Sequence, residues 1–143
     1  MTLSYKTILQ VIPEAKGYAN EEISFLTVSF FSDEKQAKGL FAPVYGKDSG
    51  DLLTAIANGA IGAIWDINEE IPSYTPNHFP IFYTNDIKKG LYKMIELYEQ
   101  NLNGQQHAKF IYAKDSSETA LETYDGAVIK TLLANDEMGG ERA

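Results

Sequence analysis

The fold is decided by residues 49–65, which read SGDLLTAIANGAIGAIW. The first part predicts a short helix that opens at residues 49–51 and runs to Asn58, with Gly59 suited to a left-handed cap. The second part, residues 60–65, is the apolar run typical of a strand buried on both faces. A helix that leads directly into such a strand is the repeating unit of α/β proteins, so this stretch predicts an α/β domain.

The segments on either side continue this alternation of helices and strands. We predict a first helix that Pro13 ends, strands at 23–31, 40–45, 60–65, 81–84 and 109–113, and further helices over about 86–101 and 116–134. Pro43 should weaken strand 40–45 or place it at an edge of the sheet, because proline cannot donate a hydrogen bond to a neighbouring strand. The expected architecture is a three-layer α/β/α domain with a mixed sheet of about five strands, covering residues 1–135 and followed by a flexible tail over 136–143.

The charge balance excludes several classes of protein. Twelve basic residues against twenty acidic ones give a net charge of −8, and Arg142 is the single arginine. Because arginine is the usual ligand of phosphates and bases, we expect no nucleic-acid partner. The chain has no cysteine, so it cannot form disulfides or thiolate metal sites. No apolar run is long enough to span a membrane, and the first ten residues do not resemble a signal peptide, so a cytoplasmic location is expected.

Three short motifs follow one another between residues 27 and 66. They are Phe31-Ser32-Asp33, then KGLFAPVYG over residues 38–46, then NGAIGAI over residues 58–64. In this order and spacing they resemble the N-terminal, UDP-binding domain of the Mur ligases, most closely of the types that add the third residue and the terminal dipeptide to peptidoglycan precursors. The resemblance covers about residues 4–102, and the segment 108–134 adds one strand and one helix to it.

The resemblance implies a ligand site at one serine and one loop. In the family these positions contact the uridine part of the precursor, and here they are Ser32 and the loop residues Gly46, Lys47, Asp48 and Ser49. The sequence departs from the family where Asp33 replaces an arginine, and the loop after Gly46 is about three residues shorter. The alternative is a structural role for both serines. The Ser32 hydroxyl would then bond its own turn, and Ser49 would cap the helix that follows.

The family's ATP-binding loop has no counterpart in this sequence. In a complete ligase a glycine-rich loop with a lysine wraps the phosphates of ATP. The corresponding residues 114–119 read KDSSET and contain no glycine. His78 and His107 lie far apart in sequence and have no partner at metal-ligand spacing, so we expect no metal, no cofactor and no catalysis.

Two hypotheses for the function remain open. The first is a non-catalytic Mur ligase N-terminal-like domain that binds a UDP-linked precursor, such as a UDP-sugar or a UDP-muramoyl peptide, or a related nucleotide. The alternative is a protein-interaction or regulatory module that has kept the fold and lost the ligand, with a protein partner or a second copy of itself. The last predicted helix has an apolar face, and this face fits either packing on the sheet or contact with a partner.

Overall fold

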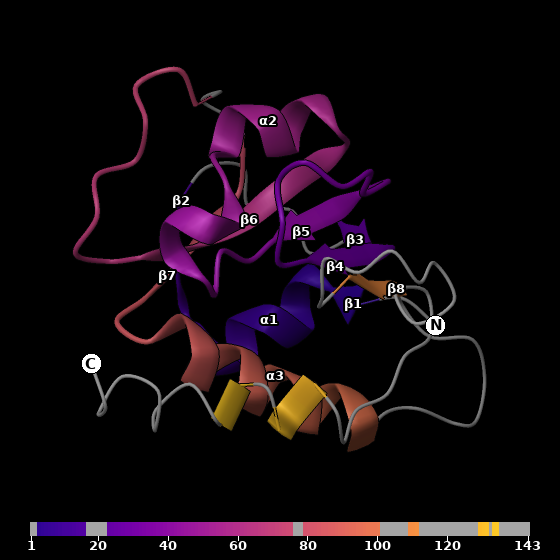
Figure 1. Ribbon diagram of the computed structural model, residues 1–143. Coiled ribbons are helices and arrows are strands. Elements are labelled where there is room, and N and C mark those ends of the chain that lie inside the picture. The colour runs from indigo at the N-terminus through magenta and orange to yellow at the C-terminus, as the bar shows by residue number, and fades with distance from the viewer. Residues whose placement is uncertain are drawn as a thin grey trace.

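The computed structural model describes residues 3–16, 23–75, 79–100, 109–111, 129–131 and 133–134 (Figure 1). Within these residues, the predicted helices and strands are present, together with two short strands, Leu3–Ser4 and Glu14–Lys16, that the sequence did not predict. The predictions for His78, for His107, for most of the last helix and for the tail over 136–143 lie outside the described residues.

The elements are short, apart from one long helix. The strands are β1 (Leu3–Ser4), β2 (Glu14–Lys16), β3 (Ser24–Phe25), β4 (Thr27–Ser29), β5 (Gly39–Phe41), β6 (Ala60–Asp66), β7 (Ile81–Thr84) and β8 (Lys109–Ile111). The helices are α1 (Tyr5–Val11), the 3-10 turn η1 (Gly46–Ser49), α2 (Leu52–Ala57) and α3 (Ile87–Gln100). Residues 129–131 and 133–134 are also helical.

The main sheet has six strands in the order β2-β7-β6-β5-β4-β8. Strand β2 runs antiparallel to β7, and all the other neighbours run parallel. Strands β4, β5, β6 and β7 lie side by side in the order in which they occur along the chain. After α3 the chain returns to the other side of β4, where β8 pairs with it. The α/β class with a mixed sheet is therefore confirmed, with six strands where about five were predicted.

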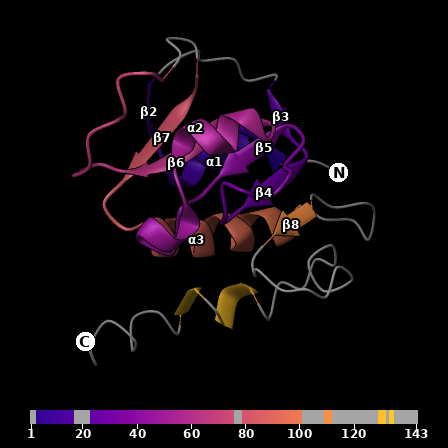
Figure 2. The ribbon, with the colours of Figure 1, turned by 45° about the horizontal axis from the view of Figure 1, so that its top comes forward.

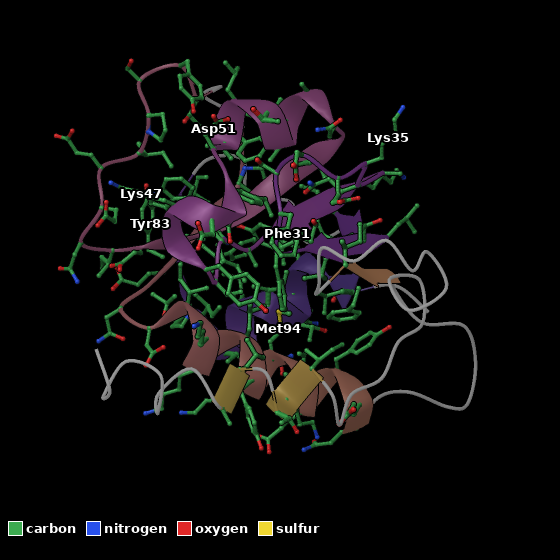
Figure 3. The ribbon with its side chains drawn as sticks, viewed as in Figure 1. Phe31, Lys35, Lys47, Asp51, Tyr83 and Met94 are labelled. Atoms are coloured by element: carbon green, nitrogen blue, oxygen red, sulfur yellow. The ribbon has the colours of Figure 1, made fainter. Side chains whose placement is uncertain are left out.

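Helices cover both faces of the main sheet (Figures 1 and 2). On one face, Leu52 and Ala55 of α2 pack against a cluster that includes Phe41 and Ala63. On the other face, the apolar sides of α1 and α3 pack against β4, β5 and β6 in a larger cluster. Its fully buried members include Ile8, Val28, Leu40, Ile64, Leu91, Met94 and Ile95. Figure 3 shows Met94 projecting from α3 toward the sheet. This arrangement gives the three predicted layers.

The segment 23–31 forms two strands instead of the single strand predicted. Leu26 interrupts the strand, is 43% exposed and donates its backbone N–H to the Lys38 carbonyl. The bend moves β3 out of the main sheet, and β3 pairs with β1 in a separate antiparallel sheet of two strands. Only β4 continues into the main sheet.

Of the two effects predicted for Pro43, the edge position is wrong. Strand β5 lies between β4 and β6 in the interior of the sheet. It ends at Phe41, and Ala42 makes the last backbone bond to β4, from its N–H to the Ser29 carbonyl at 2.8 Å. Pro43 follows this last donor, so its missing N–H costs the sheet no hydrogen bond.

Candidate functional site

The carboxyl ends of the parallel strands form one edge of the main sheet. In open α/β sheets ligands bind outside this edge. Here a cleft of about 360 Å³ lies at the ends of β5 and β6. We call it the strand-end cleft, and its walls are Pro43, Gly46, Lys47, Trp65, Asp66 and Ile87. A cleft of this size suits a small molecule.

The turn η1 brings Gly46 and Lys47 to the cleft. Gly46 has a φ of +60°, which lets the chain turn sharply after β5. The turn is closed by its own bonds: the Gly50 N–H donates to the Lys47 carbonyl, and the Tyr45 N–H donates to Ser49 Oγ at 3.0 Å. Lys47 is exposed on the outside of this turn (Figure 3). The turn thus presents one cation to the cleft while its serine points inward.

Ser32 is buried, and its hydrogen bonds join the segment after β4 to the segment that contains α2. Its side chain is 3% exposed, and its Oγ accepts the Asp51 N–H at 3.2 Å. Its backbone N–H donates to the Ser49 carbonyl at 2.7 Å, and its carbonyl accepts from Asn58 Nδ2 at 2.8 Å. These bonds tie the end of β4 to both ends of α2. The hydroxyl therefore has a structural role, but the sequence-based expectation that it would bond its own turn is wrong, because its partner is the distant Asp51 N–H.

The five residues implied by the resemblance separate into two groups. Gly46 and Lys47 line the strand-end cleft, and Asp48 is exposed on the same turn outside its lining. Ser32 and Ser49 lie beneath the turn, with only 3% and 1% of their surfaces exposed. A ligand in the cleft would thus contact the turn without reaching either hydroxyl.

The start of α2 is capped by an aspartate and not by Ser49. Asp51 Oδ1 accepts the Thr54 N–H at 2.8 Å, as an N-cap residue does. Bonds from the side chain and the backbone of Thr54 hold the pKa of Asp51 below its usual value. The carboxylate is therefore charged at neutral pH, and it stands close to the cleft.

Sequence reasoning did not assign Trp65, Asp66 and Ile87 to the site. Trp65 ends the strand that the sequence predicts to be buried on both faces, whereas it is half-buried and forms one wall of the cleft, with Nε1 donating to the Glu70 carbonyl at 3.4 Å. Asp66 ends β6 and accepts the Asn68 N–H. The position of an aromatic residue and an acid at the end of a buried parallel strand is the signal that could have found them.

A smaller cavity of about 290 Å³ extends the site toward the start of α3. It shares Pro43, Gly46, Asp66 and Ile87 with the strand-end cleft, and it adds Lys88. The Lys88 ammonium lies 5.6 Å from the centre of the Tyr45 ring. Burial lowers the pKa of Lys88, and the nearby Asp86 carboxylate acts in the opposite direction. Burial also raises the pKa of Tyr45.

The charges around the two cavities are mixed. Lys47 and Lys88 are opposed by Asp66, Glu69 and Asp86. Each cation can therefore attract an anionic group locally, while the site as a whole has no strong positive field. Within the described residues, no group of three acidic or histidine side chains is arranged to hold a metal ion.

The chain matches no protein-family model, no curated protein and no solved structure. Among the residues that the structure describes, no helix has the length and apolar character needed to cross a membrane.

Proposed function

We propose that this protein is a non-catalytic binding domain whose strand-end cleft holds a UDP-linked peptidoglycan precursor or a related nucleotide. One observation carries the proposal: Gly46, Lys47 and Trp65 line a single cleft at the carboxyl edge of the parallel sheet. The resemblance to the Mur ligase N-terminal domain supports the uridine nucleotide as the ligand, and a cytoplasmic location goes with it.

The cleft offers two of the groups that such a ligand needs. The indole of Trp65 provides a flat surface on which a uracil ring can stack. Lys47 provides a charge for the diphosphate, although Asp66 and Glu69 reduce its effect. We therefore expect weak binding, and the ligase reaction itself is not expected, because the sequence has no ATP-binding loop.

The ligand can be tested through the single tryptophan of the chain. We expect UDP and UDP-N-acetylmuramic acid to change the Trp65 fluorescence and to raise the melting temperature, since a ligand that binds only the folded state stabilises it. Lys47→Ala should weaken binding about fivefold, which corresponds to roughly 1 kcal/mol for one exposed charge. Calorimetry with both ligands gives the affinities.

Lys35→Ala is the matched control, because Lys35 is exposed on the β4–β5 connection and does not line the cleft (Figure 3). This variant should bind as the wild type does. The proposal fails if millimolar UDP and UDP-N-acetylmuramic acid change neither the fluorescence nor the melting temperature. Equal affinities of Lys47→Ala and wild type would place the ligand outside the strand-end cleft.

A protein-interaction module is the second candidate, and an exposed apolar pair favours it. Leu53 on α2 is 57% exposed and Tyr74 on the β6–β7 loop is 45% exposed. The Leu53 backbone N–H donates to the Tyr74 hydroxyl at 3.1 Å, so the two residues are neighbours on the surface. Adjacent exposed apolar side chains are common in contact surfaces between proteins.

This second candidate predicts an association that depends on the patch. Leu53→Asp should abolish a homodimer, or the binding of a protein partner, because a charge in an apolar contact must be desolvated. Light scattering measures the homodimer, and a pull-down followed by binding assays with the purified partner measures the second case. Leu26→Asp is the control, since Leu26 is 43% exposed on another part of the surface. A monomer without any partner would count against an interaction module.

A further inference from the structure

A cavity of about 550 Å³ lies between α3 and the helical segment formed by residues 129–131 and 133–134, whose Leu133 and Ala134 line it. Figure 2 shows this segment along the side of α3 that faces away from the sheet. The segment is held in place by Ile129 and Leu133, which are 0% and 3% exposed and belong to the larger core cluster. An ion pair between Lys130 Nζ and Glu99 Oε1 at 2.6 Å also joins this segment to α3. The cavity is therefore built from two elements that are fixed to each other.

Three lysines of α3 face this cavity in a chain whose net charge is −8. Lys88, Lys89 and Lys93 all line it, and they are a quarter of the twelve basic residues of the protein. Lys89 and Lys93 are exposed, so their ammonium groups remain accessible to a ligand. Because the cavity also lies beside the amino-terminal end of a helix of 14 residues, the helix dipole adds to the positive potential.

Two acids also line the cavity, and both have other partners. Asp86 Oδ1 accepts the Lys89 N–H at 3.1 Å and caps α3. Glu96 interacts electrostatically with Lys130, whose pKa is raised chiefly by its hydrogen bond to Glu99. Among the described residues of the lining, three lysines against Asp86 and Glu96 leave an excess of one positive charge. The excess is small, but it is opposite in sign to the charge of the whole molecule.

The other described residues of the lining are aliphatic or aromatic. Leu133 and Ala134 contribute aliphatic groups, and Tyr92 contributes a half-buried ring. An inorganic ion would use only the lysines, whereas a molecule with an apolar body and an anionic group would use both walls. The volume of the cavity, about 550 Å³, is also within the usual range for small-molecule sites.

From these contacts we propose that the cavity between α3 and residues 133–134 is a second ligand site, which binds a small organic anion. The ligand has a carboxylate or phosphate group facing Lys89 and Lys93, and a short aromatic or aliphatic body against Tyr92 and Leu133. This site adjoins the smaller cavity that extends the strand-end cleft, with which it shares Asp86 and Lys88. The residues that carry the proposal, Lys89, Lys93, Tyr92 and Leu133, line neither the strand-end cleft nor its extension, so the proposal does not depend on the function proposed for that cleft.

The test uses the full chain and three probes of similar size. Phenyl phosphate and phthalate carry the two kinds of anionic group on one ring, and benzyl alcohol is the neutral control. We expect both anions to shift the amide resonances of residues 88–93 and 133–134, more strongly at low ionic strength. The relative affinities of the two anions show whether a phosphate or a carboxylate is preferred. Benzyl alcohol should bind at least about tenfold more weakly, which corresponds to roughly 1.4 kcal/mol.

The decisive variant removes the charges of the two exposed lysines that line the cavity. Lys89→Gln with Lys93→Gln should weaken both anions about tenfold while leaving the melting temperature close to that of the wild type, because both side chains are exposed. Lys6→Gln with Lys35→Gln removes the same charge from exposed positions outside the lining and should leave binding unchanged. The proposal is overturned if the two double variants bind alike, if benzyl alcohol binds as tightly as the anions, or if the shifts occur at Trp65 instead.

Discussion

Replacement of Gly50 by alanine is expected to lower the free energy of unfolding by about 4 kcal/mol. Gly50 has a φ of +99° and a ψ of −158°, a backbone conformation that is nearly exclusive to glycine and costs other residues about 1–3 kcal/mol. A methyl group there would also overlap Ser32 Oγ and lie 2.9 Å from Ser32 Cβ. Since Ser32 is buried and bonded on several sides, it cannot move aside without loss of those bonds, which adds about 2 kcal/mol. Urea denaturation followed by circular dichroism measures the change.

A second substitution separates the overlap from the backbone strain. Ser32→Gly removes the atoms that the new methyl group would meet, so Gly50→Ala should cost at least about 1 kcal/mol less in the Ser32→Gly background than in the wild type. Gly46→Ala is the matched control. Gly46 also has a positive φ, of +60°, but no atom lies within 4 Å of the position of its added Cβ. Gly46→Ala should lower the free energy of unfolding by only about 1 kcal/mol. Similar losses for Gly46→Ala and Gly50→Ala would contradict the close packing of Gly50 on Ser32.

The longer elements could be predicted because their signals are local. The run over residues 60–65 and the apolar stripe of the long helix appear as β6 and α3 within one or two residues at each end. In both cases the pattern of apolar residues that burial in the sheet or the core requires is present in consecutive residues of the chain. Such elements need no knowledge of their distant partners.

The shortest strands could not be predicted, because distant segments define them. β1 exists through the pairing of Leu3 with Phe25, and β2 exists through the pairing of Glu14 with Tyr83. Strands of two or three residues show too few alternations to reveal a period. Gly62 gives a second example within β6, since a Cβ there would lie 2.9 Å from the Phe25 ring. The sequence shows a glycine in a strand but not the ring that requires it.

At the candidate site, the sequence identified residues of suitable type but not the direction in which their side chains point. The resemblance selected the loop that forms one wall of the strand-end cleft, and Gly46 and Lys47 do line it. It also selected Ser32 and Ser49, and a hydroxyl that bonds a ligand cannot be distinguished in a sequence from one that bonds a backbone N–H. The partner of Ser32 Oγ is the N–H of Asp51, 19 positions away, and only the folded turn brings the two together.

The second large effect is expected at Phe82, where the two sheets and α1 meet. The Phe82 side chain is fully buried in the larger core cluster. Its ring centre lies 5.1 Å from that of Tyr5 on α1 and 6.3 Å from that of Phe25 on β3. Phe82 is therefore the residue of β7 through which the β1–β3 sheet packs on the main sheet.

Phe82→Ala should lower the free energy of unfolding by about 4 kcal/mol, because the lost apolar surface and the cavity both destabilise the folded state. Phe82→Leu is the control, since it retains most of the volume and should cost about 1.5 kcal/mol. Denaturation with urea gives both values. If the two variants were equally stable, the proposed packing of three rings would be wrong.

The loss of stability in Phe82→Ala should also be uneven across the molecule. This unevenness would distinguish the loss of a local contact from a general weakening of the core. With Phe82 truncated, the two rings that touch it lose a partner, and the β1–β3 sheet has only two short strands to hold it together. Amide hydrogen exchange should therefore accelerate first at residues 3–4 and 24–25, and only later at β6 in the interior of the main sheet. Uniform acceleration over both sheets would show that Phe82 supports the whole core and not the junction between the sheets.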